Sequence, residues 1–282
     1  MKLGALLNDV EADAPASVAE IEIQQVVCDS RKVVPGTLFF ALHGAKVDGN
    51  AFVREAIARG AAAIASEENP PEGLPASIPW IRVREARKAL AVTAANFFGR
   101  PADALQIVAV TGTNGKTTTT SVVDSIIKAS GAKTGLFGTI AYHTPAGDYP
   151  APNTTPESVD LQAFLAEIRD AGGRHAVLEA SSHALAMDRL WGCHFAAAVF
   201  TNLTREHMDY HKTFDDYFAA KRRDVYKRQG EDRLVKHAFQ QGERQGTLRV
   251  LTRHVIQPNE REISANPRSR SAKLRCAERV QG

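Results

Sequence analysis

Residues 108–120 constrain this chain most, because they read Val-Ala-Val-Thr-Gly-Thr-Asn-Gly-Lys-Thr-Thr-Thr-Thr. An apolar run from Ile107 to Val110 breaks into a glycine turn. Apolar side chains then recur with the spacing of a helix at Val122, Val123, Ile126 and Ile127. The pattern predicts a strand, a phosphate-binding loop and a helix in direct succession.

The residue types in this loop suit an anionic ligand. Gly112 and Gly115 allow the backbone to bend and to approach phosphate oxygens closely. Lys116 would add a positive charge, and Thr117 a hydroxyl for Mg²⁺. The first glycine comes only three residues before Gly115, so the spacing departs from the general Walker pattern. The alternative is a glycine turn that binds nothing, but Gly-Lys-Thr at the start of a helix is hard to explain by packing alone.

Length and composition predict about two globular domains, since the chain has 282 residues and 44% of them are hydrophobic. No apolar stretch is long enough to span a bilayer, and the N-terminus does not resemble a signal sequence. Three cysteines, Cys28, Cys193 and Cys276, follow no disulfide or zinc pattern. We therefore expect a cytoplasmic protein with reduced thiols and no membrane partner.

Charge is distributed unevenly along the chain. Residues 221–282 carry 16 Lys and Arg against 7 Asp and Glu, whereas the first 220 residues carry 19 against 25. A basic tail can bind nucleic acid or an anionic membrane. This tail lacks interleaved aromatic residues, regular helical spacing and any nucleic-acid-binding signature, so we expect no nucleic-acid partner.

The predicted fold class is α/β. Residues 1–98 read as a small α/β domain, with strands near 21–23, 26–28 and 36–42 and helices near 52–61 and 84–98. In residues 99–224 apolar strands alternate with helices, which together with the phosphate loop predicts a P-loop-type domain built on a parallel sheet; the family resemblance described below implies that this domain binds ATP and is incomplete. One of these helices is expected to begin at Thr155 and Pro156. Residues 225–282 form a basic tail that we expect to be disordered or foreign to the fold.

Further motifs follow in order along the chain: Asp29-Ser30-Arg31, Asn153-Thr154-Thr155-Pro156-Glu157, Glu179-Ala180-Ser181-Ser182-His183-Ala184-Leu185, and residues 202–211 with Lys221. Together with the phosphate loop they resemble the Mur ligases, most closely the MurE type, over residues 20–223. The resemblance implies an ATP-dependent acid–amino-acid ligase of peptidoglycan precursor synthesis. Such an enzyme moves the ATP γ-phosphoryl group to a carboxylate of UDP-MurNAc-L-Ala-D-Glu, and the amine of diaminopimelate or lysine then displaces phosphate.

The resemblance also implies roles for particular residues. ATP would be bound by Gly112, Thr113, Asn114, Gly115, Lys116, Thr117 and Thr118. Mg²⁺ would be held by Thr117, Glu179, His207 and Lys221, the lysine as a carbamate. Lys116, Glu179, His207 and Lys221 would take part in catalysis. The UDP-sugar peptide would contact Ser30, Asn153, Thr154, Thr155, Ser181 and Arg189.

Taken singly, several of these residues have simpler interpretations. Ser30 and Arg31 could be a turn cap with a surface charge, and residues 153–156 could be only a helix cap. His207 alone would be read as structural, and Lys221 as a solvated helix lysine. Glu179 is harder to dismiss, because a carboxylate at the end of a buried strand is costly without a partner.

The resemblance ends after Arg223, where the family continues its central domain and adds a third domain for the incoming amino acid. We therefore expect a truncated or frame-shifted, monomeric chain that does not complete the amide bond, and the identity of the third amino acid stays open. The alternatives are a non-catalytic nucleotide- or UDP-sugar-binding fragment, a sister Mur ligase that adds a dipeptide, and a folylpolyglutamate-type synthetase.

Overall fold

The structure is a computed structural model that describes residues 1–44, 47–75, 77–201, 239–246, 248–252, 254, 256–257, 260–265 and 277–279. Contacts divide the chain into two units. The first unit contains Met1–Ala104, Pro156–Glu167 and Met187–Cys193, and the second contains Leu105–Thr155, Ile168–Ala186 and His194–Gly282. The domains predicted at 1–98, 99–224 and 225–282 stay a prediction, because this division follows contacts rather than a continuous stretch of chain.

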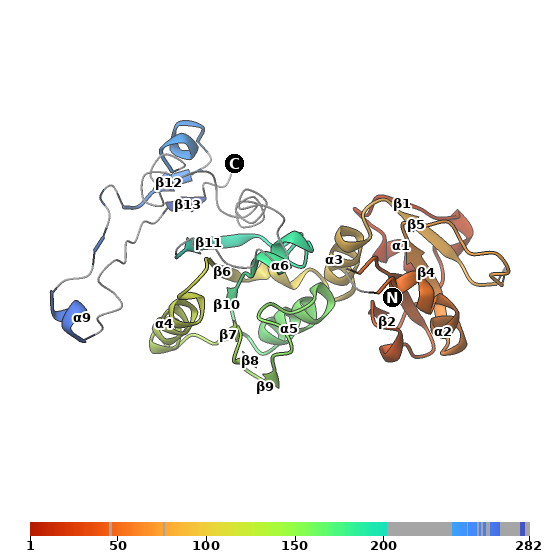
Figure 1. Ribbon diagram of the computed structural model, residues 1–282, viewed down its shortest axis with the longest axis horizontal. Coiled ribbons are helices and arrows are strands. Elements are labelled where there is room, and N and C mark those ends of the chain that lie inside the picture. Colours follow the sequence, from red (N-terminus) through yellow and green to blue (C-terminus); the bar gives the residue numbers. More distant parts are fainter. Residues whose placement is uncertain are drawn as a thin grey trace. The chain divides into compact units, whose positions relative to one another are not determined.

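The first unit is built on a five-stranded sheet in the order β1-β5-β4-β3-β2 (Figure 1). Its strands are β1 (Ala12–Asp13), β2 (Gln25–Val27), β3 (Thr37–Ala41), β4 (Ala61–Ser66) and β5 (Trp80–Val83). The strands β2 to β5 pair in parallel, and only β1 is antiparallel. Its helices and 3₁₀ turns are α1 (Leu3–Leu6), η1 (Ala16–Val18), η2 (Ser30–Lys32), η3 (Gly49–Phe52), α2 (Val53–Ala58), α3 (Ala86–Phe97) and η4 (Pro101–Ala104).

Strand β3 lies between β4 and β2, and all five of its residues are buried. Side chains alternate across a strand, so Leu38 and Phe40 face one hydrophobic cluster while Phe39 and Ala41 face another. A strand with two apolar faces needs cover on both sides, which explains the continuous apolar run in its sequence.

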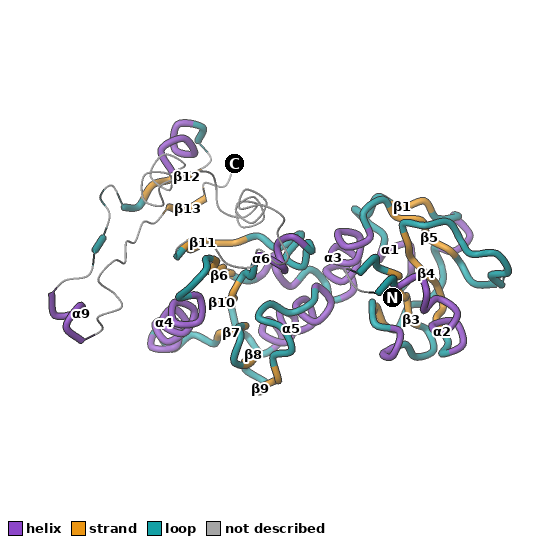
Figure 2. The backbone as a smooth tube through the Cα atoms, in the orientation of Figure 1, coloured by secondary structure: helices purple, strands orange, loops and turns teal. Residues whose placement is uncertain are grey.

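The second unit holds a six-stranded sheet in the order β11-β6-β10-β7-β8-β9. The strands are β6 (Gln106–Thr111), β7 (Thr134–Phe137), β8 (Ala141–Thr144), β9 (Gly147–Pro150), β10 (His175–Glu179) and β11 (Phe195–Phe200). The helices α4 (Lys116–Ala129) and α6 (Ser182–Ala186) belong to this unit, whereas α5 (Ser158–Asp170) is shared between the two units (Figure 2). The four strands β11, β6, β10 and β7 pair in parallel, as predicted, and β7, β8 and β9 form an antiparallel meander.

Two details differ from the sequence predictions. Helix α5 begins at Ser158 and not at Pro156, and the hydroxyl of the predicted cap, Thr155, donates to the Glu179 carbonyl at the end of β10. In α4 the apolar spacing predicted the helix correctly, but Val122 is 53% and Ile126 is 65% exposed, while Asp124 is buried. Apolar periodicity therefore located this helix without locating its buried face.

The described part of the tail contains regular structure. Strand β12 (Leu248–Val250) pairs antiparallel with β13 (Ala277–Arg279), and α9 spans Glu260–Ala265. The remainder of the expected disordered or foreign tail lies outside the described residues. Among the helices that the structure describes, none combines the length and the apolar content needed to cross a membrane.

Candidate functional site at the end of the central sheet

The predicted strand, loop and helix are confirmed by β6, residues 112–115 and α4. Gly112 has φ of +143° and Gly115 has φ of +85°, a backbone region that L-residues rarely adopt. Gly115 is the N-cap of α4, so the loop leads directly into the positive end of a helix. This arrangement of glycines and helix terminus suits the binding of a phosphate.

Two side chains stabilise the loop from opposite ends. The Lys116 Nζ donates to the carbonyl oxygens of Gly112 and Thr113, at 2.9 Å in both cases. Thr201, which follows β11, donates its hydroxyl to the carbonyl of Asn114 at 2.6 Å and its N–H to the carbonyl of Thr111 at 2.9 Å. Sequence reasoning missed Thr201, because its contact depends on β11 lying beside β6.

Glu179 ends the strand next to the loop. It stands opposite Val110 in the β10–β6 register, and the next residue, Ala180, donates its N–H to the Val110 carbonyl at 2.8 Å. The Glu179 side chain is 1% exposed. Its carboxylate accepts the Thr139 N–H at Oε1 (3.0 Å) and the Thr139 hydroxyl at Oε2 (3.2 Å). Within the described residues no lysine or arginine forms an ion pair with it.

Gly138 explains how this carboxylate can lie so close to the backbone. A Cβ atom at residue 138 would lie 2.4 Å from Glu179 Oε1, well inside any real contact. Sequence reasoning singled out neither Gly138 nor Thr139. The sequence predicted a strand over 133–140, whereas β7 ends at Phe137, so the Gly-Thr dipeptide follows the strand; its meaning depends on β7 pairing with β10.

The predicted substrate loop meets the same strand end. Thr155 is fully buried; its hydroxyl donates to the Glu179 carbonyl at 2.6 Å and accepts the Ser181 N–H at 3.1 Å. The Thr154 and Thr139 hydroxyls are 3.2 Å apart. Asn153 is exposed. The structure therefore brings the predicted residues 153–155, 179 and 181 together. The buried Thr155 hydroxyl stabilises the end of β10 through its two hydrogen bonds.

Two other predicted substrate contacts belong to the first unit. Ser30 is buried, and its hydroxyl lies 3.4 Å from Glu55 Oε2. Arg189 pairs with Glu157, a carboxylate of the chain itself. Beside Ser30, Asp29 accepts the Arg31 N–H at 3.0 Å and pairs with its guanidinium, and this bonding lowers the pKa of Asp29. The residue that caps this turn is therefore Asp29 and not Ser30, and substrate contact by Ser30 and Arg189 stays a prediction.

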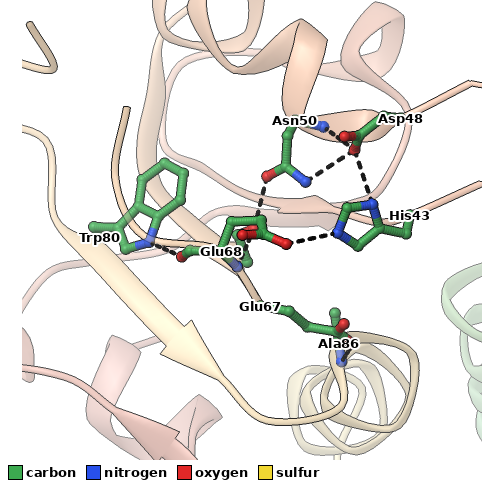
Figure 3. A network of polar contacts seen from close by, with 8 residues as sticks. His43, Asp48, Asn50, Glu67, Glu68, Trp80 and Ala86 are labelled. Carbon is green, nitrogen blue, oxygen red and sulfur yellow. Dashed lines mark hydrogen bonds and ion pairs between the residues drawn. The ribbon is translucent and has the colours of Figure 1, made fainter. Parts of the chain in front are cut away.

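The Asp48-Gly49 turn follows β3, and the next residue, Asn50, contacts Ser66 at the end of β4 (Figure 3). Asp48 Oδ1 accepts the Asn50 N–H at 2.9 Å, and Asn50 Oδ1 accepts the Ser66 hydroxyl at 2.7 Å. His43 lies between two carboxylates, with Nε2 at 3.1 Å from Glu68 Oε1 and Nδ1 at 3.4 Å from Asp48 Oδ1. Its bond to Glu68, followed by the charge of Asp48, raises the pKa of His43.

The residues at the loop fit a magnesium–nucleotide complex better than a protein-enclosed metal. Glu179 offers carboxylate oxygens and Thr117 a hydroxyl at the start of α4, and Mg²⁺ prefers such oxygen ligands together with water and phosphate. In the described part of the chain, no group of three or more His, Cys, Asp or Glu side chains could hold a metal ion by itself. His207 and Lys221 lie outside the described residues.

Two Mur ligase models match the chain. Residues 22–98 match the Mur ligase family catalytic domain, and residues 110–238 match the Mur ligase middle domain. The chain therefore belongs to the Mur ligase family over these residues. A third model, the MraW methylase family, matches residues 227–280, so the family assignment changes near the start of the tail.

The curated relatives are ligases of one kind. UDP-N-acetylmuramoyl-L-alanyl-D-glutamate--2,6-diaminopimelate ligase of Solibacter usitatus is 48% identical over 78% of this chain and 45% of its own length. The Geobacillus kaustophilus protein of the same name is 46% identical over 78% of this chain and 44% of its own length. The chain thus spans less than half the length of these relatives.

Solved structures match the same part of the chain. A structure of a ligase with that name superposes with a TM-score of 0.64 at 32% identity, covering 76% of this chain and 43% of the other. MurF from Acinetobacter baumannii superposes with a TM-score of 0.54 at 23% identity, covering 78% and 45%. The MurF likeness shows the shared fold alone.

Proposed function

We propose that residues 1–224 are the UDP-substrate-binding and ATP-binding portion of a MurE-type ligase. In this proposal the loop of residues 112–118 binds ATP, and the enzyme adds a diamino acid to UDP-MurNAc-L-Ala-D-Glu. The observation that carries the proposal is the juxtaposition of a phosphate loop with Glu179, a buried carboxylate that has no cationic partner within the described residues. The names of the curated relatives support the substrate assignment.

The chain's own residues would act mainly by positioning. Lys116 would leave the carbonyls of Gly112 and Thr113 and contact the outer phosphates. Glu179 and Thr117 would hold Mg²⁺, with His207 and Lys221 as a carbamate completing the metal site in the family pattern. When bound, Mg²⁺ supplies positive charge that offsets the charge of the transferring phosphoryl group. Asn153, Thr154, Thr155 and Ser181 would contact the UDP-sugar peptide; the family resemblance implies contacts by Ser30 and Arg189 as well.

We further propose that the tail, residues 225–282, is not part of the ligase. Its match to a methylase family supports this assignment. Catalysis of this kind depends on holding the amine near the activated carboxylate and on excluding water. Because the match covers less than half of the relatives' length, we expect these residues by themselves to bind ATP but not to complete the amide bond. The protein would act in the cytoplasm as a monomer.

Calorimetry with ATP and Mg²⁺ tests the core of the proposal. Lys116→Met keeps the stem of the side chain and removes its charge, so ATP affinity should fall strongly while the protein stays folded. Ser125→Ala on the same helix is the matched control, because it removes one exposed hydroxyl whose bond is to the backbone of α4. Equal ATP affinity for the wild-type chain and Lys116→Met would refute the nucleotide site.

The expected lack of ligase activity has its own test. The full chain is incubated with ATP, Mg²⁺, UDP-MurNAc-L-Ala-D-Glu and either meso-diaminopimelate or L-lysine, and tripeptide product is sought by mass spectrometry. At most a slow, substrate-stimulated ATPase should remain. Product formed at a normal ligase rate would show that the tail replaces the missing part, and our assignment of the tail would be wrong.

A further inference from the structure

Thr139 lies between the metal-binding carboxylate and the substrate loop. Its N–H and hydroxyl donate to the two oxygens of Glu179, at 3.0 and 3.2 Å. The same hydroxyl oxygen lies 3.2 Å from the hydroxyl of Thr154. One side chain therefore joins the end of β10 to residue 154, although the two are 25 residues apart in sequence.

The direction of these bonds follows from a proton count. An ionised carboxylate only accepts hydrogen bonds, and a threonine hydroxyl has one proton. The Thr139 proton is used on Glu179 Oε2, so the Thr154 hydroxyl supplies the proton for the bond between the two threonines. A chain of hydroxyls thus runs from Thr154 through Thr139 to Glu179, and each bond polarises the next.

The backbone around Glu179 fixes the position of the carboxylate that Thr139 contacts. Residue 138 must lack a Cβ for Glu179 to lie against the turn, and Thr155 fixes the Glu179 backbone from the other side through its carbonyl. The carboxylate is thereby held at both oxygens and at its own main chain. Partners that orient a metal ligand in this way tune its affinity for the metal.

We infer that Thr139 is a positioning residue, which aims the Glu179 carboxylate at the magnesium–nucleotide complex and couples it to Thr154 of the substrate loop. The inference rests on the proposed function. The alternative is that Thr139 only stabilises a buried carboxylate. A purely structural role would alter folding and nucleotide affinity together, whereas a positioning role alters metal affinity alone.

The test uses the full chain with ADP, and Mn²⁺ as a paramagnetic probe for the Mg²⁺ position. Electron paramagnetic resonance measures Mn²⁺ affinity of the ADP complex, and calorimetry in EDTA measures ADP affinity without metal. Thr139→Val removes the hydroxyl at nearly constant shape, and Thr139→Ser keeps it. Thr134→Val is the matched control, because Thr134 begins the same strand and its hydroxyl makes only a 3.3 Å contact to the Gly135 carbonyl.

We expect Thr139→Val to weaken Mn²⁺ binding about tenfold, the lower end of what loss of a ligand's partner costs. Thr139→Ser and Thr134→Val should bind Mn²⁺ as the wild-type chain does, and metal-free ADP affinity should not change in any variant. Thr154→Val should weaken Mn²⁺ binding in the same direction but less, because its effect passes through Thr139.

Equal Mn²⁺ affinity in Thr139→Val and wild type would overturn the inference, as would a parallel loss of metal-free ADP binding in Thr139→Val and in Thr139→Ala, the second variant. A wild-type chain that binds neither ADP nor its Mn²⁺ complex would overturn the proposed function, and this inference with it.

Discussion

Each of the two sheets has acidic residues at the carboxyl ends of its parallel strands, but the partners of these carboxylates differ between the two sheets. At the end of β3 and β4, Asp48 accepts the Asn50 N–H and faces His43, which can itself carry a positive charge. At the end of β10, Glu179 is buried and receives two hydrogen bonds from Thr139. Within the described residues it has no cationic partner. At the first edge the chain itself supplies a histidine to two carboxylates, whereas Glu179 has no such partner among the described residues, as the proposed Mg²⁺ site requires.

The largest effect is expected in the core that supports the first edge. Phe40→Ala removes a fully buried ring from β3 and should cost about 3–5 kcal/mol of unfolding free energy. Urea denaturation measures that loss. Ile126→Ala, at an exposed site on α4, should stay within about 0.5 kcal/mol of wild type. A Phe40→Ala protein of unchanged stability would show that Phe40 does not contribute to the hydrophobic core of its unit.

A smaller loss of unfolding free energy is expected at the second edge, beside Glu179. Gly138→Ala puts a Cβ where Glu179 Oε1 lies and should cost about 1–3 kcal/mol, because the carboxylate must move out of a tightly packed position. Mn²⁺ affinity of the ADP complex should fall as well. Gly147→Ala is the control, since a Cβ there meets nothing within 4 Å. If both substitutions behave alike, the close approach at residue 138 does not hold Glu179.

The reactivity of the Cys28 thiol tests how well the first unit shields this half-buried side chain from solvent. Burial, reinforced by the charges of Glu157 and Asp160, raises the pKa of Cys28 to about 12. The thiolate is the reactive form, so Cys28 should not react with a thiol reagent at about pH 8. Cys28→Ser should consequently leave the number of fast-reacting thiols unchanged. A drop of one thiol in the variant would mean that this part of the unit opens readily.

The smallest effect is a pH dependence at the first edge. Glu68 and Asp48, with Glu67 nearby, raise the pKa of His43, and the Arg87 guanidinium donates to its carbonyl oxygen. The stabilisation is therefore complete below the ordinary histidine value of about 6.5 and is lost as pH rises through the raised value. Because the pair is half exposed, it should amount to less than about 1 kcal/mol. His43→Gln should be less stable than wild type at about pH 5.5 and equally stable at about pH 9; a difference that persists at the higher pH would contradict this.

Much of the fold was predictable because its signals are local. The apolar run of β6, the glycines with positive φ and the helix that starts at Lys116 all follow from neighbouring residues, and the structure confirms them. The parallel sheet followed from alternating apolar strands and helices. The predicted start of α5 was wrong by two residues, and the bond from the Thr155 hydroxyl to the Glu179 carbonyl could not be predicted, because it joins residues far apart in sequence.

The sequence by itself determined the phosphate loop, because backbone bending, charge and helix initiation are properties of adjacent residues. It also identified Glu179 and the 153–155 loop as separate motifs. Only the tertiary structure decided that Gly138, Thr139 and Thr201 support these motifs. Their contacts depend on β7 lying beside β10 and on β11 lying beside β6, and no local pattern encodes which strands become neighbours. Strand pairing creates this edge by bringing together groups that are tens of residues apart, and the entropy of closing those loops is offset only by the packed sheet as a whole.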